Sequence, residues 1–126
     1  MSRQELTTKK CVPCEGGVPV CTREETDRHL HALSDWQLTS DGKRIHRSWV
    51  AKDFMTAIRF FQQVAELAEA EGHHPDLHLA NYRQVTIEIW THAIGGLSEN
   101  DFILAAKIDR IPFGAEGNGE RGTGNG

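Results

Sequence analysis

The sequence lacks both a cluster of positive charge and a long run of apolar residues. Its 14 Lys and Arg are outnumbered by 18 Asp and Glu, and the formal net charge is -4. Phosphate binding normally needs a clustered excess of Lys and Arg, so we exclude a nucleic-acid partner. No apolar run approaches the roughly 20 residues of a membrane span, and the polar residues 2–5 are not typical of a signal peptide. We therefore expect no membrane contact and a cytoplasmic location.

Cysteine is also scarce, with Cys11, Cys14 and Cys21 all in the first fifth of the chain. An odd number fits poorly with a secreted disulfide framework, so we expect reduced thiols. The C-x-x-C spacing is one half of a zinc knuckle, and Cys21 adds a third thiolate, but a closed zinc site needs a fourth ligand. We therefore predict no metal and no cofactor, and the role of the three cysteines stays open.

Composition divides the chain into three parts. Residues 1–21 show no sustained periodicity, and we expect an extended N-terminal arm there because turn-forming residues interrupt it: Pro13, Gly16, Gly17 and Pro19. Residues 112–126 are dominated by Gly and polar residues, which bury too little to offset their ordering entropy, so a disordered tail is predicted. The folded domain is expected over residues 22–111.

The first half of the domain predicts a helix, a hairpin and a second helix. Thr22 and Glu25 form a capping box that opens a helix with Leu30 and Leu33 on its buried side. The Asp41-Gly42 pair predicts a hairpin between strands at 36–39 and 44–51. The next helix is capped by Asp53 and has an apolar face of Phe54, Ile58, Phe61, Ala65 and Ala68, widened by Phe60, Val64 and Leu67. Gly72 is placed where a helix terminator belongs.

The second half predicts another hairpin and a last helix. Strands are expected at 77–82 and 85–92, the latter with Val85, Ile87, Ile89 and Thr91 on one face. Ser98, with Asp101 three residues on, caps the last helix. The predicted fold class is α+β, with a four-stranded antiparallel sheet made of two hairpins and three helices packed on one face. Trp90 and other apolar groups on the other face favour a subunit interface.

Three of the seven histidines stand at the ends of predicted elements. His73 and His74 follow a helix end, Pro75 prevents that helix from resuming, and His92 ends a strand. Catalytic groups concentrate at such positions. Adjacent histidines project in different directions, which disfavours a metal pair, whereas capping of the helix end explains one of them at most. Spacing alone leaves acid/base catalysis and a structural role as alternatives.

Several spaced motifs resemble the pterin-4a-carbinolamine dehydratase family. They are "HHP" at 73–75, "TH" at 91–92 and "GLSENDFILAAKID" at 96–109, and the similarity extends back through "KDFMTAIRFF" at 52–61. The resemblance implies the α+β fold expected above, a dimer or tetramer, and no metal. It also implies a lyase of the 4a-hydroxytetrahydrobiopterin dehydratase type, which dehydrates 4a-hydroxytetrahydropterin.

By this resemblance, His73 and His92 take the general acid and base roles, and His74 holds the pterin ring. Such proton transfers suit histidine, whose ordinary pKa is about 6.5. Asp101 matches an aspartate of the family, where it orients an imidazole, although helix capping explains it equally well. Leu77 occupies a substrate-binding position at which the familiar dehydratases often have an aromatic residue.

The resemblance also allows a second function. "CVPCEGG" at 11–17, with "HHPDLHL" at 73–79, is similar to a dehydratase-like branch that includes Rubisco assembly factors of chloroplasts and carboxysome operons. Members of that branch keep the fold but act as chaperones, which is possible because a fold does not determine a function. The partner is then the Rubisco large subunit instead of a pterin, and the protein is expected to associate with the carboxysome.

Overall fold

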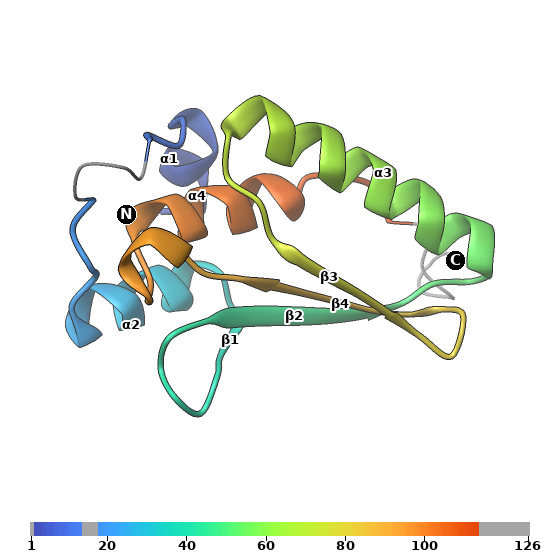
Figure 1. Cartoon of the computed structure of the whole chain (residues 1–126), viewed down its shortest axis with the longest axis horizontal. Helices are drawn as coiled ribbons and strands as arrows, with labels where there is room; N and C mark the ends of the chain where they lie inside the picture. Colours follow the sequence, from blue (N-terminus) through green and yellow to red (C-terminus); the bar gives the residue numbers. More distant parts are fainter. Residues whose placement is uncertain (1, 14–17, 114–126) are drawn as a thin grey trace.

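The computed structural model describes residues 2–13 and 18–113 and confirms the α+β fold class (Figure 1). One sheet of four antiparallel strands is covered by helices on one side. The helices are α1 (Arg3–Thr8), α2 (Arg23–Ala32), α3 (Phe54–Glu71) and α4 (Glu99–Ile108), with a short 3-10 turn, η1, at His92–Ile94. The strands are β1 (Gln37–Leu38), β2 (Ile45–Val50), β3 (Asp76–Ala80) and β4 (Gln84–Ile89).

The two predicted hairpins join through their longer strands. The strand order is β1-β2-β4-β3, and β2 pairs with β4 over six residue pairs from Ile45↔Ile89 to Val50↔Gln84. Alternate residues of β4 point into the core, as the period of two predicts: Val85, Ile87 and Ile89 are fully buried. The second hairpin turns earlier than expected, because Asn81 and Tyr82 have φ of 49° and 55° and cannot continue a strand.

The apolar face of α3 lies about one residue away from the predicted centre. Phe60, Val64 and Ala68 are buried, whereas Phe54 and Ile58 are 49% and 36% exposed. The prediction of Phe54 and Ile58 as buried residues is therefore wrong. Phe60 and Val64, which we treated as a widening of the face, are buried together with Ala68 of the predicted face. Phe60 packs edge-on against Phe113, with ring centroids 4.7 Å apart.

The N-terminal segment is not uniformly extended, so that expectation is wrong for residues 3–8. Ser2 and Glu5 form a capping box that opens α1, in which the Ser2 N–H donates to Glu5 at 2.8 Å. A six-residue helix is marginal by itself, but Leu6 is fully buried and α1 packs against α4. Tertiary contact therefore stabilises a turn that the local sequence only permits.

Two further expectations fall partly or wholly outside the described residues. These are the role of Cys14 and the predicted tail, of which residues 114–126 are not described. The division into arm, domain and tail at residues 21 and 111 stays a prediction. Within residues 2–13 and 18–113, no helix is both long and apolar enough to cross a membrane.

Candidate active site

The end of α3 delivers two histidines to one edge of the fold. Gly72 adopts a left-handed conformation with φ of 68°, which an L side chain would strain, and its N–H caps the last turn. The next backbone N–H, of His73, still donates to the carbonyl of Ala68 at 3.2 Å. His73 is thus fixed by backbone contacts immediately after the helix, and its side chain is only 6% exposed.

The end of β4 brings the third histidine to the same edge. The strand stops at Ile89, earlier than predicted, and Thr91 forms an isolated bridge with Gly96. His92 therefore begins the η1 turn instead of ending a strand, and Gly95 closes that turn with φ of 62°. This turn leaves the His92 side chain exposed.

Asp101 is the buried centre of the site. One carboxylate oxygen, Oδ1, lies 2.6 Å from His73 Nε2. The other, Oδ2, accepts from the Ser98 backbone N–H and from the Thr91 hydroxyl, both at 2.8 Å. Asp101 caps α4 and contacts an imidazole at the same time, so the two sequence-based explanations do not exclude each other; its role in orienting that imidazole stays a prediction.

A small pocket of about 150 Å³ opens beside this pair. Its lining residues are Gly72, His73, His74, Trp90, His92 and Ala93. His74 lies at the rim with its side chain 63% exposed, and its Nε2 is 2.5 Å from Glu69 Oε2. The three histidines singled out in the sequence therefore meet at one pocket.

Leu77 is not brought into this lining. It lies on the edge strand β3 opposite Ile87 and is 39% exposed. Its neighbour Asp76 accepts a hydrogen bond from the lining residue Trp90, but Leu77 itself is not a lining residue. Its substrate-binding role stays a prediction.

Trp90 is a pocket residue that the sequence analysis assigned elsewhere, to a subunit interface. Its ring centroid lies 4.3 Å from that of His92, and Arg44 stacks over it at 4.4 Å. The indole N–H donates to Asp76 at 3.3 Å, while Arg44 is held by Glu88 at 2.9 Å. Its position directly before the Thr-His motif was the only available signal of this role.

These groups suit proton transfer. A buried carboxylate that accepts from an imidazole fixes the ring's orientation and favours the tautomer protonated at Nε2. His92 provides a second imidazole at the same pocket, open to solvent. Within residues 2–13 and 18–113, no group of three or more His, Cys, Asp or Glu side chains is arranged so that it could hold a metal ion.

Comparisons with known proteins show which family the chain is similar to. The family model described as pterin 4 alpha carbinolamine dehydratase matches residues 19–111. A relative from Arabidopsis thaliana, named pterin-4-alpha-carbinolamine dehydratase 2, mitochondrial, is 51% identical over 87% of this chain, which spans only 60% of that protein. A relative from Azoarcus sp. (strain BH72), provisionally named for the same activity, is 44% identical over 91% of this chain and 96% of its own length.

A solved structure is similar as well. The crystal structure of a transcriptional coactivator/pterin dehydratase from Brucella melitensis has a TM-score of 0.68 and 36% identity. The match covers 72% of this chain and 96% of the other.

Proposed function

Since the chain belongs to the pterin 4 alpha carbinolamine dehydratase family, we propose that it dehydrates 4a-hydroxytetrahydropterin by histidine acid/base catalysis. The observation that carries this proposal is the buried His73–Asp101 pair at a pocket shared with His92. The reaction loses water, since the C4a–O bond breaks as its oxygen gains a proton and N5 loses one. The electron pair of the broken N5–H bond forms a C4a=N5 double bond, and the pair of the C4a–O bond leaves with the water oxygen. The reaction therefore needs no oxidant or reductant, and no redox cofactor is required.

His73 and His92 are the proposed acid and base, because both line the pocket. Asp101 is proposed to orient the His73 imidazole through the 2.6 Å contact. His74 is proposed to bind the pterin ring at the rim, where Glu69 holds its imidazole. Positioned proton transfer of this kind typically contributes about 10²–10⁴-fold to the rate.

The test is a dehydration assay on purified protein with single-histidine variants. We expect His73→Ala and His92→Ala each to reduce kcat by about 10²-fold or more. His78→Ala is the matched control, because His78 is exposed on β3 and does not line the pocket. A wild-type rate equal to the spontaneous rate would end the proposal.

A second candidate is a chaperone role in Rubisco assembly, with the Rubisco large subunit as the partner. The size of the pocket favours it, because about 150 Å³ is below the usual 300–1,000 Å³ of small-molecule sites. Leu77, outside the lining, adds no wall to it. Coexpression with Rubisco subunits should then raise the yield of assembled enzyme, and an unchanged yield with folded protein would refute this role.

Assembly and location complete the proposal. We propose a homo-oligomer, either a dimer or a tetramer, in the cytoplasm, with carboxysome association only under the second candidate. Sedimentation of the purified chain distinguishes the oligomers, and a monomer would contradict this part.

A further inference from the structure

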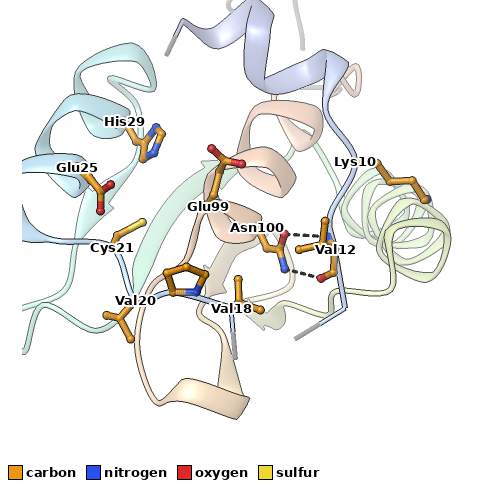
Figure 2. Close-up of a pocket in the computed structure, with 10 residues that line it drawn as sticks. Lys10, Val12, Val18, Val20, Cys21, Glu25, His29, Glu99 and Asn100 are labelled. Carbon is orange, nitrogen blue, oxygen red and sulfur yellow. Dashed lines mark hydrogen bonds between the residues drawn. The ribbon is translucent and has the colours of Figure 1, made fainter. Parts of the chain in front are cut away.

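The N-terminal segment is bound to one side chain in each of the two chain segments that carry His73 and Asp101. Asn100, the residue before Asp101, donates from Nδ2 to the Val12 carbonyl at 2.8 Å, and its Oδ1 accepts from the Val12 N–H at 3.0 Å. Figure 2 draws both bonds, with Asn100 projecting from α4 towards the segment. The arm is thus held by main-chain contacts that do not depend on the Val12 side chain.

The neighbouring residue, Cys11, is bound to a side chain at the end of α3. The Cys11 N–H donates to Glu71 Oε1 at 2.9 Å, and Glu71 is the last residue of α3, two before His73. Lys107 of α4 holds the second oxygen of Glu71 at 2.7 Å. Cys11 and Val12 therefore link the end of α3 to the first turn of α4, and we call these two residues the arm clamp.

This clamp lies outside the region that the family model matches, which begins at residue 19. It is nevertheless well anchored: Asn100 is only 2% exposed, and the Cys11 thiol contacts the Asn100 carbonyl at 3.5 Å. Earlier in the same segment, the buried side chain of Leu6 holds α1 against α4. The contacts therefore join the segment ahead of the matched region to Glu71 and Asn100 within it.

We propose that Asn100, acting through the arm clamp, is a positioning residue for the His73–Asp101 pair. The proposal rests on the proposed dehydratase function. Asn100 and Asp101 are adjacent in the first turn of α4, so fixing one side chain restrains the rotation of the turn that aims the other. Because the pair's 2.6 Å contact joins α3 to α4, releasing the clamp lets the two helix ends separate. A misplacement of even 1 Å can cost about 10²-fold in rate.

The test uses the full chain with the substitution Val12→Pro. Proline has no backbone N–H, so this variant loses the hydrogen bond to Asn100 Oδ1 without changing Asn100 itself. Val12→Ala is the matched control, because it keeps both main-chain groups. We expect Val12→Pro to lower kcat roughly tenfold with KM nearly unchanged, as a smaller displacement than 1 Å would. Val12→Ala should match the wild type. Asn100→Ala, if folded, should reproduce the effect of Val12→Pro.

A second measurement separates this inference from the proposed function. In ¹⁵N-labelled protein, the Nε2–H of His73 that faces Asp101 should give a downfield proton signal, which Val12→Pro shifts or broadens and Val12→Ala preserves. A wild-type signal in Val12→Pro would overturn the inference whether or not the protein is an active dehydratase. A changed signal without any dehydratase activity would support the clamp and refute only the reaction.

Discussion

His73 and Asp101 are 28 residues apart in the sequence, yet their side chains meet at 2.6 Å with 6% and 0% exposure. Burial removes competing water, so this charge-assisted contact is both stronger and more directional than a surface pair. The same carboxylate holds Ser98 and Thr91. The first turn of α4, the end of β4 and the loop after α3 are therefore tied at one residue.

Asp101→Asn should reduce kcat by about 10²-fold, because an amide has only one acceptor oxygen. It cannot accept hydrogen bonds both from His73 and from the cap, as the two carboxylate oxygens do. The unsatisfied buried partner should lower the free energy of unfolding by about 1–3 kcal/mol. Assays of kcat and chemical denaturation measure the two effects. Asp109→Asn is the control: Asp109 is also buried, but it binds Trp36 and Arg47 away from the pocket. It should lose stability and keep kcat; equal kcat losses in both variants would contradict the assignment.

The sequence predicted the groups of this site better than their connections. The Ser98-to-Asp101 spacing identified a helix cap from neighbouring residues alone. The contact with His73 depends on how α3 packs against α4, and no local pattern encodes that. Leu77 is the converse case, because a family position suggested a substrate contact, whereas the lining of the pocket does not include that residue and its role stays a prediction. Phe54 and Ile58 were misplaced because a helix with apolar residues over a wide arc does not reveal which part of the arc meets the sheet.

Trp90→Ala should raise KM and lower kcat/KM by roughly tenfold, because His92 loses the ring that it packs against, an interaction worth about 0.5–1.5 kcal/mol for aromatic pairs. Trp90→Phe should recover part of the loss, since it keeps an aromatic face. Steady-state kinetics at one pH provide the measurement. Trp36→Phe, which removes an indole distant from the pocket, should leave KM unchanged. Wild-type kinetics in Trp90→Ala would exclude a role for Trp90 in the site.

The two described cysteines should resist thiol reagents in the folded protein. Burial, together with Glu71, raises the pKa of Cys11 to about 12, and burial, together with Glu25, raises the pKa of Cys21 to about 11. Because the thiolate is the reacting form, a Cys14→Ser variant should react with a disulfide reagent at pH 8 at least about tenfold more slowly when folded than in denaturant. Equal rates in a folded sample would show that Cys11 and Cys21 are accessible and ionisable.

The ring of His29 is stacked on Phe102, with ring centroids 4.6 Å apart. Within the described residues, its buried Nδ1 has no hydrogen-bond partner. Burial lowers the pKa of His29 and Arg28 lowers it further, while Glu99 and Glu25 partly oppose the shift. The folded state therefore favours the neutral imidazole.

The sign of the pH dependence follows from this lowered pKa. Below about pH 6.5 the unfolded chain binds a proton that the folded chain resists, so stability is full above that pH and falls as the pH decreases towards the folded pKa. His29→Phe keeps a stacked ring without a titratable group. Thermal melts between pH 7.5 and 5.5 should show a smaller decrease in Tm for His29→Phe than for the wild type, because only the wild type carries a titratable group at position 29. Parallel decreases in the two proteins would show that His29 contributes nothing to acid sensitivity.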